Sequence, residues 1–403
     1  MRGVTRGIAV GVVVTGLLLG CRGPDPRPPE PQTPQSSWAH NMRSLSTTVM
    51  DILPYLFDEQ AYESPQNASA IRKGLGELAE TAHHISPSAQ LPVSKNDPGL
   101  HFSLEDMREN IARSIGAFDG GQKAYSRQMA KAVLNKCFHC HTRNQLGPQL
   151  EQPISNTPKL KLLRPLERLD LYVALRNYDK ALSEARELIS RPIQGENRGF
   201  EVDGAIQKGL TIAVRVKRDP QMGMQLVDLA LKNPTLPFYL RQNGLSWRQG
   251  LLAWSQSRKV TNADPLLQAR RLLDSQGHSP YSSLRIEHLI ASTLLHDYLQ
   301  TPRGKNETAE AFYLLGRSYE GLKDFGSQFL GETYFEACIE LAPKTRWSER
   351  CYRGLEEGVY SAHATSSGIF VPKTLLEKLD RLRLRALGPK WHTEGFDPTR
   401  SGN

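Results

Sequence analysis

Apolar residues recur every three or four positions through most of the chain, which predicts an all-α protein. In the first half this spacing predicts four helices, at about 36–57, 68–84, 103–118 and 122–143. Ser103 is a good start for the third helix because Glu105 and Asp106 follow it. Gly120 and Gly121 then separate the third helix from the fourth. Four helices around one apolar interior predict a bundle.

The fourth predicted helix carries a stripe that we expect to face this interior. Its members are Tyr125, Met129, Val133, Cys137, Cys140 and His141. In the first helix, Leu45, Val49 and Leu53 continue the apolar interior.

Residues 160–388 are predicted to be helical and repetitive. Ala309–Tyr319 combines a bulky residue, Leu-Gly and Tyr at helical spacing; Phe335, Cys338 and Pro343 continue the pattern. Leu169–Ala181 has a similar turn-and-Ala pattern, with a second helix ending near Pro192. These units resemble a degenerate tetratricopeptide repeat, which implies a helical solenoid whose groove binds a protein or peptide. A generic α-helical domain is the alternative interpretation.

The chain begins with Arg2 and Arg6, an apolar run from Ile8 to Leu19, and then Gly20-Cys21. This resembles a bacterial lipoprotein signal peptide over residues 1–20, which implies that Cys21 becomes the lipidated first residue. The run is short of the about 20 apolar residues of a membrane-spanning helix, although a signal anchor is the alternative. Arg22 is not the Asp associated with inner-membrane retention, so the resemblance implies the periplasmic face of the outer membrane. The Pro-rich segment 21–35 is expected to be an extended linker.

Length and charge narrow the classes of function. A chain of 403 residues predicts two or three domains. The chain has 51 Lys and Arg residues against 42 Asp and Glu residues. Most of this excess lies in residues 147–403, which contain 36 basic and 29 acidic residues. This diffuse excess, without a run of five basic residues, favours a mixed solvated surface over a nucleic-acid partner. No phosphate loop, dinucleotide-binding fingerprint or zinc-protease motif is present, so we predict no enzyme activity.

The chemical centre of the sequence is Cys137-Phe138-His139-Cys140-His141, a C-x-x-C-H motif. On a helix, positions i and i+3 face the same side, so two sulfurs can bond one porphyrin edge while His141 presents its imidazole to the iron. We therefore predict one covalent haem c. A thiol–disulfide site or half a zinc site is the alternative, but zinc needs a second Cys/His pair and a thioredoxin-like site needs a βαβ context.

About 100 residues of helical pattern precede the motif, and Gly147-Pro148 ends the unit. A haem on the last of four helices resembles the cytochrome c′ family over residues 36–148. The family commonly has an aromatic and a basic residue shortly after the motif. Here only Arg143 is available to contact the haem propionates, and it lies earlier than usual.

The sixth iron ligand decides between an electron carrier and a gas-binding site. In the cytochrome c′ family the distal position lies on the first helix, and this resemblance places Met42 there. Met42 as an ordinary core residue is the alternative. Lesser ligand candidates are His40 and Met50. Met107 or Met129 would be a ligand only in a different arrangement of the bundle. We interpret His83, His84 and His101 as solvent-exposed or packing residues, and His139 as a spacer.

The remaining segments carry weaker signals. Residues 149–159 read as an interdomain linker and 389–403 as a tail. Cys338 and Cys351 flank the turn at Pro343, so a disulfide between two antiparallel helices is expected, with two buried small residues as the alternative. We assign no role to the loop Thr365–Gly368, because a serine nucleophile there would have only His363 as a nearby base.

Three functions remain. The first is a membrane-anchored electron-transfer cytochrome with Met42–His141 iron, whose repeat domain docks a redox or assembly protein. The second is a gas-binding or gas-sensing haem protein with an open sixth position. The third is an assembly scaffold in which the haem is structural.

Overall fold

The computed structural model describes residues 34–85, 97–144, 163–193, 196–259, 264–274, 284–322 and 329–389. The predicted signal peptide 1–20, Cys21, nearly all of the Pro-rich linker, the linker 149–159 and nearly all of the tail lie outside these ranges. Within them the chain is all-α apart from one short hairpin. No helix in the described part is long and apolar enough to cross a bilayer.

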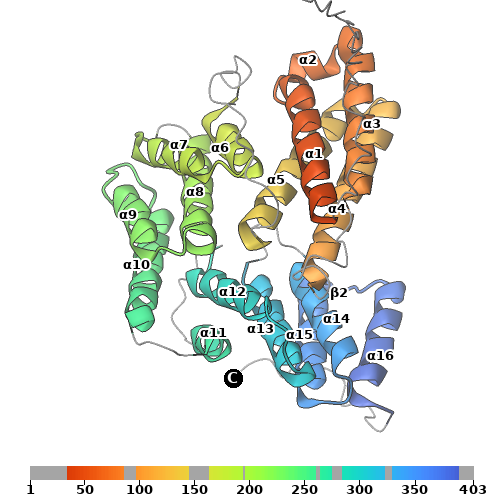
Figure 1. Ribbon diagram of the computed structural model, residues 1–403, viewed down its shortest axis with the longest axis vertical. Helices are drawn as coiled ribbons and strands as arrows, with labels where there is room; N and C mark the ends of the chain where they lie inside the picture. The colour runs from red at the N-terminus through yellow and green to blue at the C-terminus, as the bar shows by residue number, and fades with distance from the viewer. Residues whose placement is uncertain are drawn as a thin grey trace, which may run out of the picture.

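The first group of helices, here called the N-terminal helices, packs side by side in the upper part of Figure 1. Its members are α1 (Pro34–Leu56), α2 (Glu59–Glu63), the 3-10 turn η1 (Pro65–Asn67), α3 (Ala68–His84), α4 (Pro98–Asp119) and α5 (Lys123–Asn144). Their interior is apolar, with Leu53, Leu78 and Ile111 almost fully buried. Asn41 of α1 donates to the carbonyl of His84 at the end of α3, so these two helices run antiparallel.

Two details of the predicted elements are wrong. Helix α4 begins five residues before Ser103, because Asp97 caps it by accepting from Gly99 N–H and Pro98 occupies the first turn. In α5 the first two positions of the predicted stripe are displaced by one residue: Ser126 and Ala130 are buried, whereas Tyr125 is 45% exposed. Val133 is buried as predicted. Position 126 faces the interior because the Ser126 hydroxyl lies within hydrogen-bond distance of Tyr62 on α2 and Ser114 on α4.

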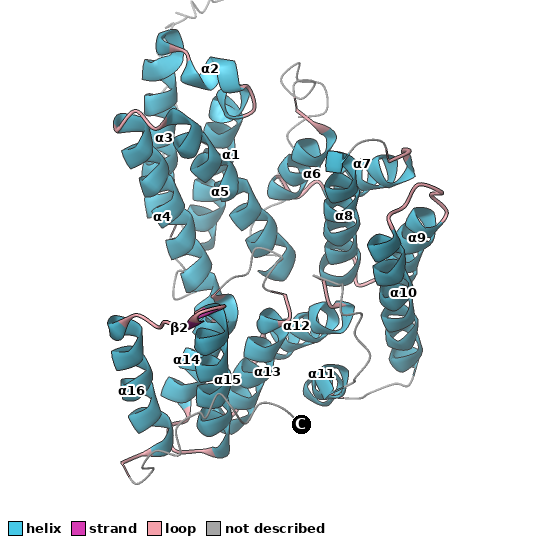
Figure 2. Cartoon of the chain, turned by 180° about the vertical axis from the view of Figure 1, so that it is seen from behind, coloured by secondary structure: helices cyan, strands magenta, loops and turns pink. Residues whose placement is uncertain are grey.

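The C-terminal helices form a curved array (Figures 1 and 2). In chain order they are α6 (Pro165–Ala174), α7 (Tyr178–Ser190), α8 (Glu196–Thr211), the π-helical η4 (Ile212–Val216), α9 (Pro220–Leu231), α10 (Phe238–Lys259), α11 (Pro265–Asp274), α12 (Ile286–Tyr298), α13 (Lys305–Glu320), α14 (Leu330–Leu341), α15 (Arg346–Ala362) and α16 (Lys373–Leu387). Cys338 on α14 and Cys351 on α15 form a disulfide.

Glycines allow close approach between helices of this array. A Cβ atom at Gly316 of α13 would lie 2.3 Å from Phe335 of α14, and one at Gly354 of α15 would lie 2.7 Å from the same ring. Phe335 is therefore wedged where only glycine fits on either side.

The loop Thr365–Gly368 belongs to a hairpin of β1 (Ala364–Thr365) and β2 (Gly368–Ile369). Thr365 Oγ1 donates to the carbonyl of Gly368, and His363 Nδ1 lies 2.9 Å from the Val359 carbonyl. His363 thus contacts the backbone of its own helix.

The array contacts the N-terminal helices at its first helix, in its middle and near its last helices. Helix α6 packs on α5 and α14 packs on α4, while η4 and α12 also contact α5. One continuous cluster of buried apolar side chains runs from Trp38 on α1 to Ala386 on α16. The C-terminal end of α5 therefore points into the curve of the array (Figure 1).

Candidate functional site

The C-x-x-C-H segment forms the last turns of α5. Cys137 and Cys140 are partly exposed, and neither forms a disulfide. Cys137 follows Ala130 and Val133 by seven and four residues, so the three share a helix face, yet the two earlier residues are only 2% and 1% exposed. The interior-facing side of α5 thus becomes accessible where the motif begins.

Burial keeps both cysteines protonated. Burial and Cys140 raise the pKa of the Cys137 thiol to about 12. The pKa of Cys140 is also raised, again chiefly by burial, although the cations of Arg143 and Arg176 act in the opposite direction. Both sulfurs are therefore neutral thiols at neutral pH.

His141 lies against the turn between α6 and α7. Tyr178, at the start of α7, donates from its hydroxyl to the backbone carbonyl of His141 at 3.2 Å. Burial, and then the positive charge of Arg176, lower the pKa of His141 to about 4, while the carbonyls of Val173 and Ala174 act to raise it. The imidazole is thus neutral at neutral pH, which is the state that binds iron. Its Nδ1 has no hydrogen-bond partner among the described residues.

Met42 lies at the same end of the N-terminal helices. Arg127, early in α5, pairs with Glu59, which follows the end of α1, so the last turns of α5 lie near the beginning of α1. Met42 is partly buried and packs against the apolar core one turn before Leu45. Trp38, a further turn earlier, is buried, and its indole Nε1 has no partner in the described part of the chain. The structure thus places Met42 and the motif at one end without showing a contact between them.

The remaining candidate ligands, and the three histidines expected to be exposed or packing residues, divide by exposure. His40, His83, His84 and His101 are exposed, whereas Met107 is buried and Met50 and Met129 are partly buried. No group of three or more His, Cys, Asp or Glu side chains within the described ranges could hold a metal ion. A haem iron takes at most two protein ligands, so this finding does not bear on it.

Arg143 ties the end of α5 to the start of α4. Its Nη2 donates to the Gly99 carbonyl at 2.9 Å and to Ser103 Oγ at 3.1 Å. Asp97 Oδ1 accepts from Gly99 N–H and, at 2.6 Å, from the hydroxyl of Tyr334 on α14. Arg143 is only 4% exposed, so its contact with a propionate stays a prediction.

Behind Asp97 lies a buried aromatic cluster that joins α12, α13 and α14. The rings of Tyr319 and Tyr334 stack with centroids 5.6 Å apart. His296 Nε2 lies 2.8 Å from the Tyr319 hydroxyl, and the guanidinium of Arg215 lies over the Tyr319 ring. These polar groups connect the motif end of α5 to the C-terminal helices.

His139, the predicted spacer, is surrounded by cationic side chains. Burial, followed by the charges of Arg215 and Lys136, lowers its pKa well below the ordinary value. Phe138 is 1% exposed, and the Lys208 ammonium lies 5.9 Å from its ring centroid.

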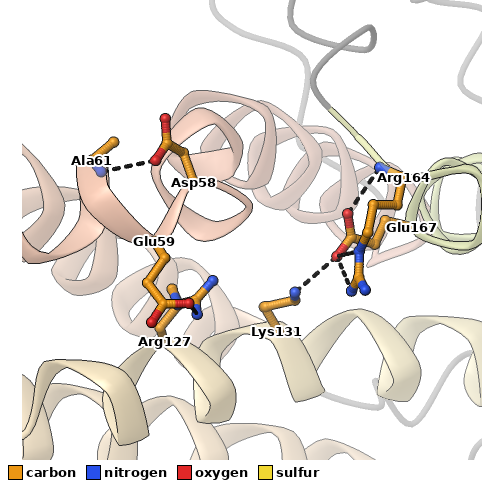
Figure 3. A network of polar contacts seen from close by, with 7 residues as sticks. All are labelled: Asp58, Glu59, Ala61, Arg127, Lys131, Arg164 and Glu167. Atoms are coloured by element: carbon orange, nitrogen blue, oxygen red, sulfur yellow. Dashed lines mark hydrogen bonds and ion pairs between the residues drawn. The ribbon is translucent and has the colours of Figure 1, made fainter. Parts of the chain in front are cut away.

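A network of ion pairs joins the two groups of helices further up α5 (Figure 3). Glu167 of α6 accepts from Lys131 of α5 at 2.9 Å and from Arg164 Nη2 at 2.7 Å. Burial alone would raise the pKa of Glu167, but these hydrogen bonds more than offset it. A cavity of about 400 Å³ runs beside the network and reaches Asn135, two residues before Cys137.

Sequence reasoning found the motif but missed the residues that surround it. Asp97 was readable only as a helix cap before Pro98, and Tyr178 only as part of a repeat unit. Nothing in their local sequence predicts that they meet the end of α5, because both contacts span distant segments. No family model, curated protein or solved structure matches this chain.

Proposed function

We propose that the chain is a membrane-anchored, periplasmic c-type cytochrome that transfers electrons through one covalent haem. The observation that carries the proposal is the C-x-x-C-H segment at the partly exposed end of α5, with both thiols unbonded. When bound, the haem supplies a one-electron iron couple. The C-terminal helices would dock the redox or assembly partner.

Each residue of the motif has a distinct role in this proposal. Cys137 and Cys140 would hold the haem through thioether bonds, and the neutral imidazole of His141 would be the proximal ligand. The Nδ1 atom of His141 supports the role of this residue, since it is a buried ring nitrogen without a partner among the described residues. Met42 would be the distal ligand.

The architecture proposed for this function has two parts. Helices α1, α3, α4 and α5 would form a cytochrome c′-like four-helix bundle, and α6–α16 a tetratricopeptide-like solenoid. The wedge of Phe335 between Gly316 and Gly354 supports the second assignment, because small residues at helix crossings are typical of stacked helix pairs. Lipidation of Cys21 and an outer-membrane location rest on the sequence alone.

A second candidate function is gas binding at an open sixth position. The observation that favours it is the packing of Met42 against the apolar core of the N-terminal helices. A methionine held by apolar neighbours has less freedom to reach an iron.

The test is an absorption spectrum of the mature protein produced with a haem-attachment system. Spectra are recorded oxidised, reduced, and reduced under carbon monoxide. A covalent low-spin spectrum indifferent to carbon monoxide is expected for Met42 ligation and electron transfer, whereas a high-spin spectrum that shifts with carbon monoxide supports gas binding. Absence of covalent haem contradicts both functions.

The chain offers a matched control for the cysteines. Replacing both motif cysteines, Cys137→Ala with Cys140→Ala, should abolish attachment. Replacing the disulfide pair, Cys338→Ala with Cys351→Ala, should leave it intact. Equal attachment in the two double variants would contradict the assignment of the motif.

A further inference from the structure

The turn between α6 and α7 places a cation and a phenol beside the motif, although it belongs to the C-terminal helices. Helix α6 packs along α5 and ends at Ala174, and α7 begins at Tyr178. The connecting residues fold back tightly, since Arg176 N–H donates to the Val173 carbonyl and Asn177 N–H to that of Tyr172.

Arg176 holds an unusual backbone conformation in this turn. Its φ is +59°, in the left-handed region that few side chains other than Gly, Asn and Asp adopt readily. Such a conformation persists only where the surroundings determine it, and it is a recognised feature of functional sites. Here the surroundings are the end of α5 and the start of α7.

Two independent contacts connect this turn to the motif. Tyr178, 6% exposed, hydrogen-bonds the His141 carbonyl. The imidazole of His141 hydrogen-bonds the backbone of Val173 and Ala174, which come just before Arg176. The side chain of Arg176 hydrogen-bonds Tyr178, so its charge lies beside the residue that holds the His141 carbonyl. Arg143, the only cation that the sequence placed near the haem, is instead bonded to the start of α4.

We propose that Arg176 and Tyr178 form the outer shell of the haem-ligating His141, so that the C-terminal helices set the reduction potential of the haem. This inference rests on the proposed function. A nearby cation destabilises the more positively charged ferric form, and therefore Arg176 raises the potential. Tyr178 is a positioning residue that fixes the backbone of His141.

Arg176→Asn in the full-length haem protein is the first test, because asparagine tolerates the left-handed backbone and removes the charge. In a spectroelectrochemical titration at fixed potential, we expect the ratio of ferrous to ferric protein to fall about tenfold, which corresponds to about 59 mV for one electron. Arg176→Lys keeps the positive charge, so its reduction potential should stay close to that of the wild-type protein. The matched control is Arg191→Asn at the far end of α7, whose side chain pairs with Glu187.

The second test separates positioning from general stability. Tyr178→Phe should shift the g-values of the ferric haem in electron paramagnetic resonance, while Tyr172→Phe, on the neighbouring helix, should leave them unchanged.

The outcomes distinguish this inference from the proposed function. A wild-type protein without covalent haem overturns both. If wild type carries haem, but Arg176→Asn matches Arg191→Asn in potential and Tyr178→Phe matches Tyr172→Phe in g-values, the inference alone is overturned.

Discussion

Removal of the Tyr334 hydroxyl should weaken the junction between the two groups of helices. The loss of stability should exceed that caused by removing the hydroxyl of a buried tyrosine with a neutral partner. Tyr334 is fully buried, and its hydroxyl donates to Asp97 Oδ1 at 2.6 Å. Tyr334→Phe deletes this bond but leaves Asp97 its bond from Gly99 N–H. A hydrogen bond to a charged group contributes about 1.5–3 kcal/mol, so we expect the free energy of unfolding to fall by about 2 kcal/mol.

Tyr62→Phe is the matched control. Tyr62 is equally buried, and its hydroxyl lies 2.7 Å from Ser126 Oγ, a neutral partner that keeps its contacts with Ser114. A neutral hydrogen bond contributes about 1 kcal/mol. Urea unfolding at pH 7, followed by circular dichroism, measures the free energy of unfolding of both variants. The comparison is valid if this free energy falls with urea concentration at the same slope in both.

The difference between the two variants should depend on pH. Burial acts to raise the pKa of Asp97, but Arg143, His296 and the hydrogen bonds from Tyr334 and Gly99 together lower it below 3.8. Ionised Asp97 therefore contributes stability above pH 3.8, and this contribution is lost as the pH falls through the lower folded pKa. The extra cost of Tyr334→Phe should shrink over that range. Equal losses for the two variants at pH 7 would refute the reasoning.

Three further predictions concern the C-terminal helices. Replacing Cys338 and Cys351 by alanine opens a loop of sequence separation 13 and should cost about 3 kcal/mol in urea unfolding; an unchanged midpoint would show that the disulfide adds nothing. Gly316→Ala places a Cβ 2.3 Å from Phe335 and should cost about 1–3 kcal/mol, whereas Gly116→Ala on α4 meets nothing within 4 Å and should gain up to about 1 kcal/mol; a gain in both would contradict the wedge. Burial lowers the pKa of His296 to about 3 from 6.5, so the unfolded chain takes up a proton first and stability should fall as pH drops from 6.5 towards 3; His296→Gln should flatten this slope in unfolding measured from pH 7 to 4, and an unchanged slope would count against it.

Helical periodicity predicted the elements better than their surroundings. The helix at 68–84 was predicted with the bounds that α3 has, because its apolar spacing and flanking residues are local signals. The start of α4 was missed because Ser103 and Asp97 both offer capping side chains. Asp97 caps the earlier start and also accepts from Tyr334, 237 residues away, a contact that no local signal encodes.

In the candidate site, too, local residues could be predicted from the sequence but their long-range partners could not. Thiol spacing predicts Cys137, Cys140 and His141 as haem-binding residues, since haem attachment demands that local pattern. The partners of Arg143 and His141 come from α4, α6 and α7, and no local pattern encodes them. Periodicity alone favours Tyr125 over Ser126 as the buried position, whereas Ser126 is buried through its contacts with Tyr62 and Ser114 on other helices.

The most direct test of the central claim is the mass of the tryptic peptide 137–143, which cleavage after Lys136 and Arg143 releases from the mature protein. We predict that the peptide carries one haem on its two cysteines and resists alkylation. The same peptide without added mass, with both thiols open to alkylation after production with a haem-attachment system, would contradict the account.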